Sequence, residues 1–145
     1  MDDLTRAIQE ADSLLSGGDS ANPIMKYIAS AESNYGRYNP ETALSYGPFQ
    51  IDPIRYYDIV QNPTRIKGKH GERMKVVNEY LRKKFNDPNF NISKLATYNP
   101  QTNDYDKDSR NLQYLRDPLV GAMLTRLALK QRPDQLPSKD KLGEY

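Results

Sequence analysis

Residues 30–53 of this 145-residue chain read SAESNYGRYNPETALSYGPFQIDP, and they decide how the rest of the sequence is interpreted. The stretch begins where Ile24, Ile28 and Glu32 follow one another at intervals of four residues. That spacing places the three side chains on one face of a helix, so the glutamate extends an apolar stripe by one turn. An acid at a position where the pattern calls for a core residue needs an explanation.

The sequence around this stretch predicts a mainly α fold. Each of three dipeptides combines an N-cap residue with proline at the first helical position, where proline loses no hydrogen bond. These dipeptides are Asn22-Pro23, Asp52-Pro53 and Asp117-Pro118. Apolar spacing and these caps predict helices over residues 2–15, 23–34, 53–60, 71–86 and 118–131.

Two segments interrupt the helical pattern. Residues 36–51 contain glycine and proline among aromatic and β-forming residues, which predicts a small irregular or hairpin insertion. Residues 99–110 (NPQTNDYDKDSR) predict a polar surface loop. We therefore expect a helical domain of α+β character in which one short insertion is not helical.

Length and composition limit the classes of protein. A chain of 145 residues suits one domain, residues 1–145, and the alternative is the N-terminal part of a longer native chain. The absence of cysteine excludes disulfides and thiol chemistry, and one histidine cannot build a His-rich metal site. No window approaches the roughly 20 apolar residues of a membrane span. We expect no metal and no cofactor.

Charge is distributed unevenly along the chain. The net charge of +2 argues against a dedicated nucleic-acid binder. Residues 65–84, however, carry eight Lys or Arg side chains and two Glu, which would suit a polyanionic partner. The alternative is a solvated helix face followed by a loop. His70 lies in this basic segment, and we expect it to be exposed to solvent.

The position of Glu32 favours a general acid. Partial burial disfavours the charged carboxylate, and the carbonyl groups at a helix C-terminus carry partial negative charge. Both effects would raise the pKa of Glu32, so that the side chain could donate a proton near neutral pH. The alternative is a glutamate in the last helical turn that simply reaches solvent.

The residues that follow provide a second signal. Ser45-Tyr46-Gly47-Pro48-Phe49-Gln50-Ile51 contains a glycine that permits close approach of a ligand, and a glutamine that can both donate and accept hydrogen bonds. Ala31-Glu32-Ser33 followed by Ser45-x-Gly47-x-x-Gln50-Ile51-x-Pro53 resembles the signature of soluble lytic transglycosylases and goose-type lysozymes. Members of that family have Gly-Leu-Met-Gln where this chain has Gly-Pro-Phe-Gln, and a longer interval between the serine and the glycine.

The resemblance covers residues 24–53 well and residues 117–131 loosely. It implies a lysozyme-like fold, peptidoglycan as substrate, and Glu32 as the single essential carboxylate. It also implies that Ser33 supports the glutamate and that Ser45 and Gln50 line the cleft near the scissile sugar. Tyr46 and Gly47 belong to the same segment, and Tyr46 is a candidate for contact with the sugar.

Other candidate residues carry weaker signals. The family has a late Tyr-Asn pair, which Tyr98-Asn99 matches in identity, although the pair here precedes the 118–131 helix rather than following it. Glu41 is the candidate for a second carboxylate across the cleft, whereas Asp52 fits an N-cap better. Asp104-x-Asp106-x-Asp108 mimics a calcium loop, but it lacks the glycine and the final glutamate of that motif.

The function expected from this resemblance is cleavage of peptidoglycan between N-acetylmuramic acid and N-acetylglucosamine, with a 1,6-anhydro product. A hydrolytic lysozyme of the same fold is the first alternative, and a catalytically inactive sugar-binding or structural virion module is the second. Residues 1–15 lack the features of a secretory signal. A bacteriophage protein is therefore expected, either in the virion with other virion proteins as partners or in the host cytoplasm before release.

Overall fold

The computed structural model of the protein describes residues 3–15, 49, 51–105 and 112–131. Its elements are the α-helices α1 (Asp3–Leu14), α3 (Pro53–Val60), α4 (Gly68–Lys84) and α5 (Pro118–Gln131), the 3-10 helices η1 (Ile92–Lys94) and η2 (Leu112–Arg116), and the strands β1 (Tyr98–Asn99) and β2 (Asp104–Tyr105). This composition confirms a mainly α fold. The expected helix 23–34 and most of the 36–51 insertion lie outside the described residues. None of the described helices is long and apolar enough to cross a membrane.

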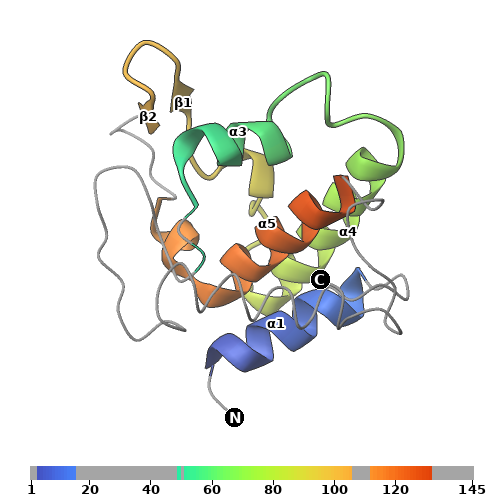
Figure 1. Ribbon diagram of the computed structural model, residues 1–145. Helices are drawn as coiled ribbons and strands as arrows, with labels where there is room; N and C mark the ends of the chain where they lie inside the picture. The colour runs from blue at the N-terminus through green and yellow to red at the C-terminus, as the bar shows by residue number, and fades with distance from the viewer. Residues whose placement is uncertain (1–2, 16–48, 50, 106–111, 132–145) are drawn as a thin grey trace, which may run out of the picture.

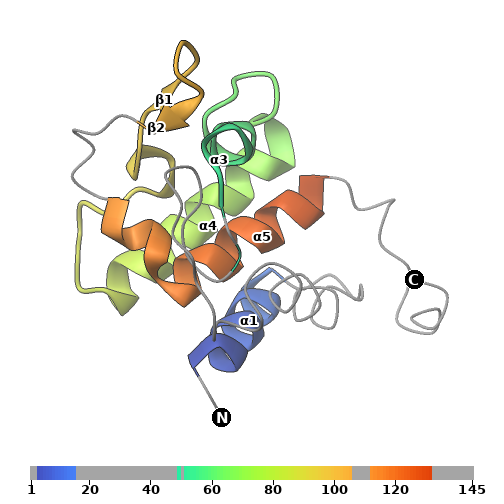
Figure 2. The same cartoon turned by 60° about the vertical axis from the view of Figure 1, so that its left-hand side comes forward.

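Helix α5 runs through the middle of the described structure, with α1 packed along it and α3 and α4 on its other sides (Figures 1 and 2). Every residue from Leu119 to Leu127 is buried. A helix enclosed in this way has no polar face, so its sequence shows an apolar stripe only loosely. Gly121 has a packing role, because a Cβ there would lie 3.1 Å from Cδ2 of Phe49.

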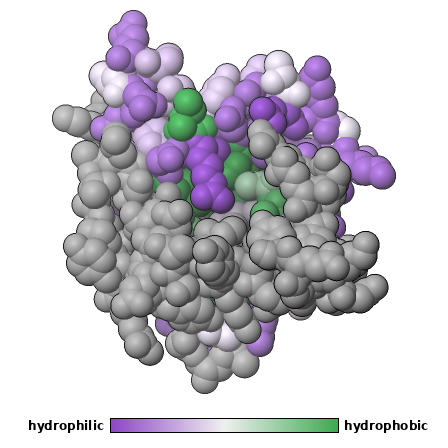
Figure 3. Space-filling model, in the orientation of Figure 1, coloured by the Kyte–Doolittle hydropathy of each residue, from purple (hydrophilic) through white to green (hydrophobic). Residues whose placement is uncertain are grey.

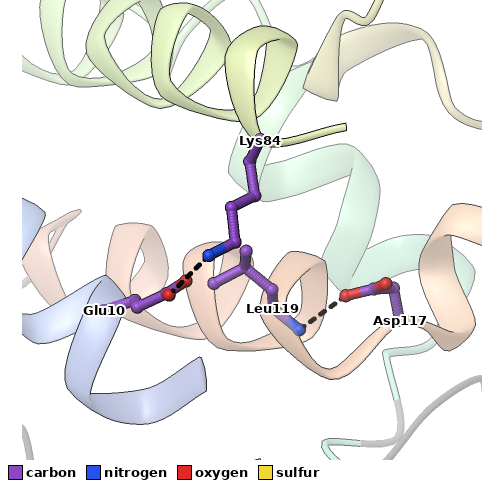
Figure 4. A network of polar contacts seen from close by, with 4 residues as sticks. All are labelled: Glu10, Lys84, Asp117 and Leu119. Atoms are coloured by element: carbon purple, nitrogen blue, oxygen red, sulfur yellow. Dashed lines mark hydrogen bonds and ion pairs between the residues drawn. The ribbon is translucent and has the colours of Figure 1, made fainter. Parts of the chain in front are cut away.

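The aspartates that precede the two proline-started helices are N-caps, as predicted. Oδ1 of Asp52 accepts a hydrogen bond from the Arg55 N–H at 2.8 Å, and Oδ1 of Asp117 accepts one from the Leu119 N–H at 2.8 Å (Figure 4). Each bond satisfies a backbone donor that has no partner within the helix. The bounds of α3 and α5 agree with the predicted residues 53–60 and 118–131.

An ion pair joins α4 to α1 beside the start of α5. The Nζ of Lys84 donates to Oε1 of Glu10 at 2.8 Å (Figure 4). The hydrogen bond and the negative charge of Glu10 raise the pKa of Lys84. The lysine is exposed to solvent, so the pair contributes little to stability.

Helix α4 begins at Gly68, three residues before the predicted start at residue 71, and it ends at Lys84, two residues before the predicted end at residue 86. Its end is a Schellman motif, because the Asn86 N–H donates to the Lys83 carbonyl and the Asp87 N–H to the Arg82 carbonyl. Asn86 has φ +51°, the left-handed conformation that stops the helix and that asparagine tolerates. The start of α4 is set by a tertiary contact of His70, described below.

A two-stranded hairpin occupies part of the predicted loop 99–110, and this corrects the prediction for its first residues. Strands β1 and β2 are antiparallel, with Tyr98 opposite Tyr105 and Asn99 opposite Asp104. Residues 100–103 are exposed, as expected of a polar loop. The tyrosines explain the difference, because the rings of Tyr105 and Tyr98 pack against Tyr56 and Tyr57 of α3.

Tyr56 connects α3 to the segment that contains η1. Its buried hydroxyl donates to the Ile92 carbonyl at 2.8 Å and accepts from the Leu95 N–H at 2.9 Å. Burial raises the pKa of Tyr56 well above its ordinary value, because the phenolate would lose its hydration. One hydroxyl therefore satisfies a buried acceptor and a buried donor that lie three residues apart.

We predict that Tyr56→Phe lowers the free energy of unfolding by about 2–4 kcal/mol, because it leaves both backbone groups buried without their partner. Urea denaturation followed by circular dichroism would measure the loss. Tyr57→Phe is the matched control, since the Tyr57 hydroxyl forms no hydrogen bond with the described residues, and it should cost less than about 0.5 kcal/mol. Equal losses in the two variants would contradict the role assigned to the Tyr56 hydroxyl.

Candidate functional site

Most of the residues predicted from the resemblance fall outside the part of the chain that the structure describes. They are Glu32, Ser33, Glu41, Ser45, Tyr46, Gly47 and Gln50. Their roles remain predictions. The described structure does include the residues on either side of Gln50, the capping Asp52, and the Tyr98-Asn99 pair, so it shows the surroundings in which the end of the motif is held.

The end of the motif is anchored in the core. Phe49 and Ile51 are both fully buried. The ring of Phe49 lies against Gly121 of α5. The carbonyl of Ile51 accepts a hydrogen bond from the Tyr105 hydroxyl at 3.0 Å. Gln50 is thus flanked in sequence by two residues whose positions are fixed by α5 and by the hairpin.

Asp52 serves the helix rather than a reaction. Its Oδ1 is committed to the Arg55 N–H, and Pro53 occupies the first helical position of α3. This agrees with the expectation that Asp52 is an N-cap. Glu41 lies outside the described residues, and it stays the sequence-based candidate for a second carboxylate.

The hairpin places Tyr98 and Asn99 near the end of the motif, although some fifty residues separate them from Gln50 in sequence. Tyr98 pairs with Tyr105, whose hydroxyl binds the Ile51 carbonyl. The ring of Tyr98 also lies 5.4 Å, centroid to centroid, from the ring of Tyr57 in a tilted arrangement. The hairpin that carries the Tyr-Asn pair is therefore bonded, through Tyr105, to Ile51 at the described end of the motif.

The polar groups of Tyr98 and Asn99 have partners within the hairpin. The Tyr98 hydroxyl donates to Oδ1 of Asn103 at 3.2 Å, and Oδ1 of Asn99 accepts from the Gln101 N–H at 2.9 Å. Both side chains are half-buried. The Asn99 carboxamide shapes the turn, whereas the aromatic rings of Tyr57 and Tyr98 form a pair at the surface on which an apolar ligand face could pack.

The sequence-based prediction for His70 was wrong. The side chain is buried, with 6% exposure, and its Nε2 lies 2.7 Å from the Ile59 carbonyl. A helix that starts at Gly68 places His70 on the same face as Met74, Val77 and Leu81. This spacing was the available signal, and it was missed because the predicted helix began at residue 71.

A basic pocket of about 420 Å³ lies where the start of α4 meets the end of α5. Its lining combines exposed or half-buried Lys and Arg side chains with the buried imidazole of His70 and the carboxamide of Gln131. Sequence reasoning found the basic segment, but it did not find the contribution of α5. Another cavity, of about 510 Å³, is lined by α1 and by Tyr80 and contains none of the residues predicted from the resemblance.

No group of acidic, histidine or cysteine side chains that could hold a metal ion occurs among the residues that the structure describes. Comparisons with protein-family models, with curated proteins and with solved structures found no match to this chain.

We predict that Tyr105→Phe lowers the free energy of unfolding by about 1–3 kcal/mol, because the Ile51 carbonyl loses its buried donor. The same variant should speed amide hydrogen exchange in the hairpin. Tyr98→Phe removes a longer hydrogen bond to an exposed asparagine and should change stability by less than about 0.5 kcal/mol. If both variants unfold at the same urea concentration, the hairpin does not anchor the end of the motif through Tyr105.

Proposed function

We propose that this protein cleaves the glycan strand of peptidoglycan between N-acetylmuramic acid and N-acetylglucosamine, as a lytic transglycosylase. The proposal rests on the combination of Glu32-Ser33 with Ser45-x-Gly47-x-x-Gln50-Ile51-x-Pro53. A glutamate at a predicted helix end is common by itself, and so is a glycine before an exposed glutamine. Their occurrence together, in this order and at this spacing, is the observation that carries the proposal.

The described end of the motif supports it. A sugar-binding glutamine has to be held in place, because a ligand group that moves by 1 Å loses much of its effect on the reaction. In the sequence Gln50 lies between Phe49 and Ile51, which are fully buried, and Asp52 caps α3. These are the features expected of a binding residue supported by rigid elements.

In the proposed reaction Glu32 acts first as an acid and then as a base. It donates its proton to the glycosidic oxygen as the bond from that oxygen to C1 of the muramic acid breaks. The carbonyl oxygen of the substrate's own N-acetyl group stabilises the positive charge that develops at C1. The Glu32 carboxylate then takes the proton of the C6 hydroxyl of the same sugar, whose oxygen bonds to C1 and closes the 1,6-anhydro ring.

The intramolecular route is favoured by the single carboxylate. The C6 hydroxyl is already tethered to the reacting sugar, so its attack needs no second bound molecule. A hydrolytic lysozyme differs in one step, because water then replaces the hydroxyl. An inverting hydrolase of the usual kind would add a second carboxylate to activate that water, and Glu41 is the candidate.

The surface near the motif suits a sugar. The rings of Tyr57 and Tyr98 are half-buried and adjacent. Sugars place their C–H faces on aromatic planes, and the tyrosine hydroxyl adds a polar contact. A wall-degrading enzyme of a bacteriophage, carried in the virion or released from the host cytoplasm, is the biological setting that we propose.

We predict that Glu32→Gln reduces the clearing of a peptidoglycan suspension by a hundredfold or more, because glutamine cannot donate the proton. Co-sedimentation with the same wall preparation should persist, since the substitution keeps the shape of the side chain. Glu41→Gln is the matched control, and it should clear walls at the unsubstituted rate. Full activity of Glu32→Gln would refute the assignment of the acid.

Two further outcomes separate the alternatives. Mass spectrometry of the digested glycan should find muramic acid ends that are one water lighter than reducing ends. Reducing ends together with loss of activity in Glu41→Gln would instead indicate a two-carboxylate lysozyme. Binding to walls without any clearing by the unsubstituted protein would indicate a sugar-binding or structural virion module.

A further inference from the structure

The basic pocket between α4 and α5 has a composition that the proposed wall-degrading activity does not require. Five cationic side chains line it, namely Arg65, Lys67, Lys69, Arg73 and Lys130. None of the described residues that line the pocket is acidic. Figure 3 shows the hydrophilic surface over the connection from α3 to α4, at the upper right of the view.

Four of the five cationic side chains, Arg65, Lys67, Lys69 and Arg73, form no ion pair with any described residue. Like charges held close together repel one another, and the repulsion is relieved when an anion binds between them. The pocket therefore has a strong electrostatic preference for a ligand of multiple negative charge.

The first turn of α4 contributes to the same pocket. Lys67 is the N-cap residue, and its side chain makes no capping hydrogen bond. Gly68 has φ +56°, and a Cβ there would meet nothing within 4 Å, so the space beside the helix start is open. The first turn of this 17-residue helix carries backbone N–H groups and the positive end of the helix dipole, and its residues Lys69 and His70 line the pocket.

Among the described side chains that line the pocket, only that of His70 is buried. Its Nε2 lies 2.7 Å from the Ile59 carbonyl, an acceptor, so Nε2 carries the hydrogen. The amide nitrogen of Gln131 donates to the Asp58 carbonyl at 3.0 Å, and its 3.3 Å contact with Nε2 therefore joins two donors. The other ring nitrogen, Nδ1, is buried and has no hydrogen-bond partner among the described residues. The imidazole lines the pocket, so its NMR signals report on a ligand that binds there.

We propose that this pocket binds a small organic phosphate monoester. A phosphate dianion matches the Arg fork, the lysines and the helix N-terminus. The volume of about 420 Å³ exceeds the needs of a bare ion and falls in the range of small-molecule sites. The remaining space accommodates a polar group of the size of a sugar, which Thr64 and Gln131 can contact.

The single histidine of the chain gives a direct test, because its imidazole signals in an NMR spectrum need no assignment. We expect glucose 6-phosphate, titrated into the full chain at constant ionic strength, to shift the His70 signals in a saturable manner. Glucose should cause no shift, and inorganic phosphate should bind more weakly than the ester. Inorganic phosphate that binds as tightly as the ester would overturn the assignment of an organic ligand.

Charge-removing variants decide whether the pocket itself binds. Arg73→Gln and Lys67→Gln should each weaken the affinity for glucose 6-phosphate by about tenfold, because each removes one charge-assisted contact. Lys75→Gln is the matched control, since it removes the same charge from an exposed position of α4 that does not line the pocket. Equal weakening by all three variants, or no shift of the His70 signals, would overturn the proposal.

The last part of the experiment tests whether a short single-stranded DNA binds to the full chain. If the DNA binds, loses affinity steeply with added salt, and is not displaced by glucose 6-phosphate, the basic surface is a nucleic-acid interface and the proposal fails. Displacement of the DNA by the phosphate ester would place both at the same pocket and support the proposal. Wall clearing by Arg73→Gln should stay unchanged, so the outcome is independent of the proposed enzymatic function.

Discussion

The burial of α5 on every side is the constraint on which the described structure depends. All residues from Leu119 to Leu127 are removed from solvent, including the guanidinium group of Arg126. A buried charge is tolerated only when it is compensated. Arg126 donates to the Leu15 carbonyl at 3.0 Å, and its Nε lies 3.7 Å from Oδ1 of Asp12. An apolar helix alone could slide along its neighbours, whereas this contact fixes the register of α1 against α5. The arginine therefore specifies the packing of the two helices as well as contributing to it.

The same helix holds both described ends of the segment that carries the predicted acid. Leu15 precedes that segment, and its carbonyl is bound by Arg126. Phe49 follows the predicted site serine, and its ring lies against Gly121, where the lack of a side chain lets the α5 backbone come close. A segment attached at both ends to one rigid helix has its two ends at a fixed separation.

Local signals in the sequence predicted the elements that local interactions determine. Asp52 and Asp117 cap the helices that they were expected to cap, because an aspartate before a proline needs nothing beyond the next three residues to act as an N-cap. The start of α4 and the position of His70 depend instead on the Ile59 carbonyl, which belongs to another helix. The hairpin likewise depends on tyrosine packing against α3, which outweighs the polar composition of its turn. The apolar stripe of Ile24 and Ile28 singled out Glu32, whereas Ser45 and Gln50 could be chosen from the sequence only through a motif, since no local pattern distinguishes them from ordinary polar residues.

Helix α3 runs from the described end of the motif to the edge of the basic pocket, and it is bonded at both of its ends. Its N-terminal end follows Ile51, which the hairpin binds through Tyr105, and its last turn presents the Ile59 carbonyl to His70 at the edge of the basic pocket. Eight helical residues span about 12 Å, so ligands at the two ends do not touch unless one of them is extended. Energetic coupling between the ends would need a second discrete arrangement of α3. The Tyr56 hydroxyl, which binds both Ile92 and Leu95 inside the core, stabilises the arrangement observed against any other. The described end of the motif and the basic pocket therefore share α3 as a support, and the ligands that we propose for them differ in chemistry, an uncharged sugar face for the first and a phosphate for the second.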